Sequence, residues 1–124
     1  MRAIRFSEKL ATFEDYWHPR IVGELNGQHV KVVKLQGEFV WHNHANEDEL
    51  FLVLKGSFCM HYVDLTGNAK AVDVNEGECL IVPRGVYHRP VAEREAHVLL
   101  FEPIGTINTG SVQDVRTVKE PERV

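Results

Sequence analysis

The sequence contains two informative stretches, HNHANEDE at residues 42–49 and PRGVYH at residues 83–88. Residues two positions apart on a β-strand point to the same face, so His42 and His44 can present their imidazoles side by side. Glu49 and His88 add a carboxylate and a third imidazole. Nitrogen and carboxylate oxygen are ligands that suit divalent transition metals. The two stretches therefore predict one metal site, assembled from two distant parts of the chain.

The position of Glu49 requires a break in the strand that would carry the two histidines. Glu49 has the opposite parity to His42 and His44, so an unbroken strand would point its side chain away from them. The intervening residues include Asn46 and Asp48, which are common in turns. We expect these residues to form a bend that resets the register and turns Glu49 toward the histidines.

The run LFLVL at residues 50–54 is apolar at every position, whereas a half-buried strand alternates apolar and polar residues. If Glu49 faces inward, so do Phe51 and Val53. The outward side chains are then Leu50, Leu52 and Leu54. This outer face needs a cover, and a barrel of 124 residues has little spare chain for a second layer. We therefore predict a homodimer with this strand near the interface.

Bulk composition excludes several classes of protein. The length of 124 residues suits one domain, and a net charge of -4 without a basic run argues against nucleic-acid binding. No apolar stretch approaches the ~20 residues of a bilayer span, and the first ten residues lack a secretory signal. We therefore expect a cytoplasmic protein without nucleic-acid or membrane partners. Cys59 and Cys79 make no disulfide framework, and we expect buried, reduced thiols.

Turn signals at short intervals separate runs that are typical of β-strands. Asn26-Gly27 and Gly67-Asn68 each predict a hairpin turn. Strands are expected at residues 30–35, 39–44, 50–54, 58–65, 71–74, 79–82 and 96–101, with a last strand at 112–118. The only helix expected is a short one at residues 7–13, capped by Ser7. Many short strands without helical periodicity predict an all-β sandwich or barrel.

The spacing around the first stretch resembles the first motif of the cupin superfamily. Gly37 precedes His42-Asn43-His44, four residues separate His44 from Glu49, and six more lead to Gly56. The gap after Gly37 is one residue shorter than the commonest form of the motif.

The second stretch resembles the second cupin motif. Gly77 is followed after five residues by Pro83-Arg84-Gly85, and His88 follows after two more. Ala92 stands where the motif ends in asparagine, a position that is not usually a metal ligand.

The resemblance to small single-domain conserved-barrel (type 2) cupins implies a fold and a ligand set. It implies an all-β double-stranded β-helix, or jelly-roll cupin barrel, that is commonly a dimer. The single cupin domain would span residues 1–124, with a barrel core at about 28–103 and a tail at about 104–124. The implied metal ligands are His42, His44, Glu49 and His88, and the ligands alone do not choose among Fe, Mn, Zn, Ni and Cu.

Two hypotheses for function remain open on the sequence. In the first, the chain is a metal-dependent enzyme acting on a small organic molecule, as a dioxygenase or as an isomerase or lyase by Lewis-acid catalysis. In the second, it is a non-catalytic barrel that binds a metal and a small ligand. Glu49 and Tyr62 are the candidates for proton transfer, and neither the substrate nor the reaction type can be inferred from the residues.

Other residues near the motifs have simpler interpretations. We expect His29 to be exposed beside its hairpin and His61 to point outward. Trp41 is expected to pack behind the sheet, because its parity is opposite to that of the histidines. Arg84 is expected to be a solvated turn residue, and Glu47 to lie in a solvated acidic loop.

Overall fold

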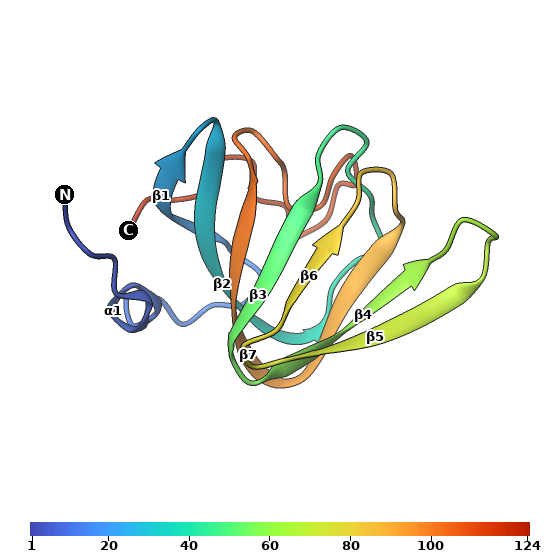
Figure 1. The fold of residues 1–124 in the computed structure, drawn as a ribbon, viewed down its shortest axis with the longest axis horizontal. Helices are drawn as coiled ribbons and strands as arrows, with labels where there is room; N and C mark the ends of the chain where they lie inside the picture. Colours follow the sequence, from blue (N-terminus) through green and yellow to red (C-terminus); the bar gives the residue numbers. More distant parts are fainter.

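A computed structural model describes residues 1–124 as seven strands and one short helix. The elements are α1 (Phe6–Leu10), β1 (Arg20–Leu25), β2 (Gln28–Glu38), β3 (Glu49–Lys55), β4 (Ser57–Val63), β5 (Ala69–Asn75), β6 (Cys79–Val82) and β7 (His88–Pro103). One row of strands runs β1-β2-β7-β3-β6, while β4 pairs with both β5 and β7. The long strand β7 therefore bends through both layers, and the β4–β5 hairpin projects to one side (Figure 1). This arrangement confirms the predicted all-β jelly-roll barrel.

The core lies between the layers, because alternate residues of each strand point inward. In β3 the buried positions are Glu49, Phe51 and Val53, and the half-buried residues between them face outward. In β2 the apolar inward residues are Val33 and Leu35, which belong to the same core cluster as Phe51. The predicted reset of register before Glu49 and the predicted faces of this strand are thus confirmed.

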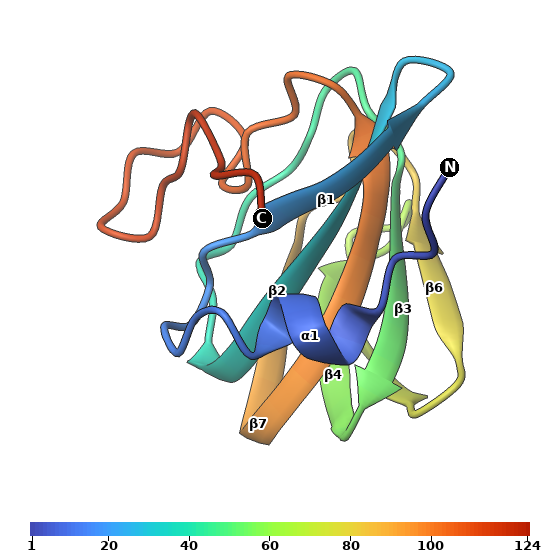
Figure 2. The same cartoon turned by 90° about the vertical axis from the view of Figure 1, so that its left-hand side faces the viewer.

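The outer face of the barrel is partly covered by the chain's own N-terminal segment. Leu10 and Phe13 form a small buried cluster with Val32, against which Leu54 packs. Figure 2 shows α1 lying across the outside of the sheet formed by β2, β7 and β3. The helix was predicted, but it begins at Phe6, and Ser7 is not its cap. No helix in this structure is long and apolar enough to cross a membrane.

Several predicted elements differ in the structure. Residues 39–48 form no strand apart from a single bridge at His42, and the tail contains no strand at residues 112–118. The tail instead returns to β1, where Ile21 forms a bridge with Arg123. The strand β1, at Arg20–Leu25, was not among the predicted strands. Cys79 is exposed rather than buried.

Candidate metal centre

His42 and His88 are brought together by a local pairing of the two motif stretches. The backbone N–H of His42 donates to the carbonyl of His88 at 3.0 Å, and the N–H of His88 donates back at 2.8 Å. Residues that are directly opposite in an antiparallel pair present their side chains on the same face. The two imidazole centroids consequently lie 4.3 Å apart. This bridge, rather than the pleat of a regular strand, sets the position of the first predicted ligand.

Two further contacts hold the stretch at residues 42–49 against the turn before His88. The N–H of Gly85 donates to the carbonyl of His44 at 2.8 Å. The N–H of Arg84 donates to Oδ1 of Asp48 at 2.8 Å, and its guanidinium pairs with the same carboxylate at 3.2 Å. Arg84 is exposed, as expected. Its contact with Asp48 holds the bend between His44 and Glu49 against the second motif.

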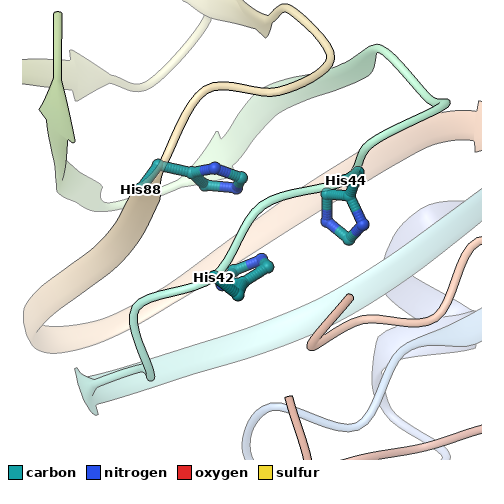
Figure 3. A group of neighbouring side chains, drawn as sticks. All are labelled: His42, His44 and His88. Carbon is teal, nitrogen blue, oxygen red and sulfur yellow. The ribbon is translucent and has the colours of Figure 1, made fainter. Parts of the chain in front are cut away.

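The three histidines form a compact and buried cluster. One ligand atom from each of His42, His44 and His88 lies within 4.8 Å of the others. The residues are 3%, 4% and 0% exposed, respectively. Figure 3 shows the three rings pointing toward one another, with His42 and His44 on the loop and His88 at the start of β7. The cluster is positioned to hold a metal ion.

Backbone carbonyls orient two of the rings. Nδ1 of His42 lies 2.9 Å from the carbonyl oxygen of Val40, and Nδ1 of His88 lies 2.8 Å from that of Val86. A carbonyl only accepts hydrogen bonds, so each Nδ1 carries the proton and each Nε2 keeps its lone pair. Nε2 of His88 and Nε2 of His44 are buried without any hydrogen-bond partner. A metal ion would satisfy such unpartnered buried nitrogens, and Nε2 of His88 has its lone pair free to bind one.

Glu49 completes the group of predicted residues. Its Oε1 lies 3.5 Å from Nε2 of His44 and 3.7 Å from Nε2 of His88, and it is also buried without a hydrogen-bond partner. The structure therefore places Glu49 beside two of the three histidines, His44 and His88.

The electrostatic environment favours metal-binding protonation states. Burial, followed by the neighbouring imidazole of His88, lowers the pKa of His42 to about 4, so its ring is neutral at pH 7. Burial by itself would raise the pKa of Glu49. The adjacent Glu102, followed by the neighbouring imidazoles of His44 and His88, outweighs that effect and holds this pKa well below its usual range. A neutral imidazole and an ionised carboxylate are the forms that coordinate metals.

Sequence reasoning missed a buried ion pair behind Glu49. Nζ of Lys31 donates to Oε1 of Glu102 at 2.8 Å, and the two side chains are 2% and 1% exposed. Burial, and then the negative charge of Glu49, raises the pKa of Glu102 well above its usual range. Strand parity could have indicated this pair: Lys31 shares its face with Val33, and Glu102 shares its face with Leu100.

Two cavities bear on where a ligand could lie, one at the cluster and one beyond the turn that precedes His88. A small one, of about 30 Å³, touches His42 and Glu49 and has room for about one or two water molecules. A much larger one, of about 820 Å³, lies between β4, β5, β6 and the turn before His88. Its lining is mostly apolar and includes Tyr62, but none of the three histidines. Tyr62 is nevertheless a neighbour of the cluster, because it pairs with His88 across β4 and β7.

Two of the remaining predictions concern residues outside the cluster. His29 is buried, not exposed, with Nε2 3.5 Å from Oε2 of Glu24. The reason is that β2 starts earlier than predicted, which places His29 opposite Glu102 within the sheet. Trp41 lies outside the cluster and stacks on Tyr87 with ring centroids 5.2 Å apart.

Comparison with known proteins identifies relatives of this chain. Residues 29–102 match the family described as Cupin domain. A cupin-2 domain containing protein from Shewanella frigidimarina NCIMB 400, known from its crystal structure, is 37% identical. That match covers 82% of this chain and 94% of the other, with a TM-score of 0.76.

A curated relative and a more distant structure add context. The uncharacterized protein YdbB of Bacillus subtilis (strain 168) is 31% identical over 68 residues, which is 55% of this chain and 57% of that protein. The chain spans between 42% and 57% of the length of the curated relatives that it matches. Hydroquinone 1,2-dioxygenase PnpCD, solved in complex with Fe³⁺, is 14% identical with a TM-score of 0.74. Over 84% of this chain and 33% of the dioxygenase chain, this is a likeness of fold alone.

Proposed function

Because the chain belongs to the cupin domain family, we propose that it is a metal-dependent enzyme acting on a small organic molecule. Its ligands to one divalent transition-metal ion would be His42, His44, Glu49 and His88. The observation that carries this proposal is the convergence of three buried atoms without partners, Nε2 of His44, Nε2 of His88 and Oε1 of Glu49. Buried polar atoms without partners are costly, and a bound ion would satisfy all three.

Four ligands from the protein leave room for exchange. If these three imidazoles and one carboxylate held an ion that prefers six ligands, two positions would stay open for exchangeable ligands, unlike in a closed structural zinc site. When bound, iron would supply dioxygen chemistry, and a redox-inert ion would polarise a carbonyl or hydroxyl group of the substrate. We place dioxygenase activity first, ahead of isomerase or lyase activity, because an Fe³⁺-containing dioxygenase is built on the same fold.

The residues around the site suggest where a substrate would lie. The 820 Å³ cavity is large enough for a small organic molecule, and its mainly apolar lining favours a ligand with an apolar body. Tyr62 contributes to that lining and pairs with His88, so its hydroxyl is our candidate for proton transfer during the reaction.

Oxygen consumption tests the proposal. Protein loaded anaerobically with Fe²⁺ would be mixed with a panel of small aromatic and aliphatic hydroxy compounds, and oxygen uptake would be recorded. We expect uptake with at least one compound, no uptake by the His44→Ala variant, and a lower kcat for Tyr62→Phe. Turnover with Zn²⁺ or Mn²⁺ but without oxygen uptake would favour isomerase or lyase activity. If the protein bound a ligand tightly but turned it over with none of the metals, the proposed enzyme activity would be overturned. A non-catalytic binding barrel would then be favoured.

A further inference from the structure

Three charged side chains lie in a row inside the barrel, one on each of three neighbouring strands. Lys31 is on β2, Glu102 on β7 and Glu49 on β3. All three are buried, and β7, which carries Glu102, lies between the strands that carry Lys31 and Glu49. The row ends at the histidine cluster, because Glu49 is its last member.

The contacts within the row connect an ion pair to the carboxylate at the metal centre. Lys31 Nζ lies 2.8 Å from Oε1 of Glu102 and 3.5 Å from the carbonyl oxygen of Thr106. Glu102 and Glu49 are neighbours across β7 and β3, because Leu50 pairs with Phe101 and both glutamates are buried on the inner face. Oε2 of Glu102 is buried without a hydrogen-bond partner, so it is free to interact with the carboxyl group of Glu49.

An ion pair in this position is poorly explained as a device for stability. The free-energy cost of removing two charges from water is about as large as the gain from their mutual attraction. Well-packed apolar residues of similar volume therefore often stabilise a protein equally well. Contacts to residues that hold a metal, in contrast, commonly fix the orientation of a ligand and tune its affinity.

We propose that Glu102, anchored by Lys31, is a positioning residue that holds the carboxyl group of Glu49 with Oε1 directed at the histidines. This inference rests on the proposed metal centre, with Glu49 as one of its ligands. Glu102 acts through Glu49 and does not itself touch the ion. Lys31 supplies the positive charge that two adjacent carboxyl groups need in a buried environment.

Titration with Co²⁺, followed by its visible absorption bands and by competition with a chelator, tests the proposal. The main variant is Lys31→Met/Glu102→Leu, which removes the ion pair as a unit instead of leaving Lys31 or Glu102 alone in the core. We expect it to fold, to bind Co²⁺ at least about 10-fold more weakly than the wild type, and to shift the absorption bands. The single variant Glu102→Gln should keep the Co²⁺ affinity and the absorption bands of the wild type, because its amide can still donate to Glu49 and accept from Lys31.

A matched control separates positioning from loosening of the strand. Val98→Ala creates a small cavity on the same inner face of β7, away from Glu49, and we expect its Co²⁺ affinity and absorption bands to match the wild type. An equal loss of affinity in Val98→Ala and the double variant would overturn the positioning role. The positioning role would also be overturned if the double variant had the Co²⁺ affinity and absorption bands of the wild type. The same holds if Glu102→Gln lost affinity as the double variant does. A wild type that binds no Co²⁺ would overturn the proposed function, and this inference with it.

Discussion

At the scale of single residues, backbone carbonyls orient the imidazoles without help from a ligand. The carbonyl of Val40 holds Nδ1 of His42, and the carbonyl of Val86 holds Nδ1 of His88. In each case the partner lies two residues before the histidine, so the local backbone sets the ring and its tautomer. A site prepared in this way pays little ordering entropy when it binds an ion.

The pKa of His42 predicts how the metal-free protein responds to acid. The ordinary value of 6.5 falls to about 4 in the folded protein. Between these two pH values the unfolded chain binds more protons than the folded protein. The free energy of unfolding therefore rises with pH, and it decreases as the pH falls from about 6.5 to 4. The loss is of the order of 3 kcal/mol. Urea unfolding of the wild type and His42→Gln across this range measures it.

The variant His42→Gln should show a flatter pH dependence of stability in that window, because glutamine does not titrate. Parallel curves for the two proteins would contradict the assigned cause of the acid sensitivity.

The direction of a side chain could be predicted where the alternation of a strand and the turn before it are visible in the local sequence. The inward direction of Glu49 follows from the turn residues before it, and the structure confirms it. Lys31 and Glu102 were missed because composition marks such residues as exposed, whereas their partner is distant along the chain. The burial of His29 was missed for a similar reason, since it depends on pairing with β7.

At the scale of elements, the loop that carries His42 and His44 is supported on two sides. The turn at residues 83–88 contacts it on one side, and the C-terminal tail packs on the other. Gly110 of the tail has a φ of 61°, and a Cβ atom there would collide with the backbone carbonyl of Asn43, between the two histidines. The tail therefore helps to position the loop.

Replacement of Gly110 by alanine should weaken metal binding, because the added methyl group would displace Asn43 and its neighbouring histidines. The matched control is Gly105→Ala, which has a similar left-handed φ of 92° but no atom within 4 Å of the added Cβ. Both variants carry backbone strain of about 1 kcal/mol, so only the steric effect separates them. Titration with Co²⁺ should show a larger loss of affinity for Gly110→Ala. Equal affinities would show that the tail does not position the loop.

The strands and hairpins with strong local signals were predicted, and the segments that depend on distant pairing were not. The Asn26-Gly27 turn joins β1 to β2, and Asn26 and Gly27 have φ values of 50° and 77°. Residues 39–44 look like a strand locally, but the structure gives them only the bridge at His42. The tail was expected to form a strand near Val112, whereas its pairing with β1 involves Arg123. Local propensity carries no information about such a long-range partner.

At the scale of the whole molecule, the outer face of the sheet is more apolar than a solvated surface. Leu50 and Leu52 face outward, and their neighbours across β7 are Phe101 and Leu99. Ile81, opposite Leu50 on β6, is an exposed hydrophobic residue. The N-terminal segment covers Leu54, so it supplies part of the cover that the sequence required. The predicted homodimer remains our expectation for the rest of this face.

Light scattering at micromolar concentration measures the assembly directly. We expect twice the mass of one chain for the wild type, and the mass of one chain for Leu52→Glu, because a buried carboxylate would oppose association. Lys70→Glu, on the exposed part of β5, serves as a charge-changing control that should remain dimeric. A wild type that scatters as a monomer would contradict the dimer.

Metal stoichiometry is the most direct measurement of the central claim, that the histidine cluster binds a metal ion. Elemental analysis after mild purification and Co²⁺ loading should find about one ion per chain in the wild type and in His18→Ala, whose side chain lies outside the cluster. His88→Ala should lose the ion and keep the β-rich circular dichroism spectrum, because it changes none of the residues of the buried apolar core. A wild type without tightly bound metal, or an unchanged metal content in His88→Ala, would contradict the account.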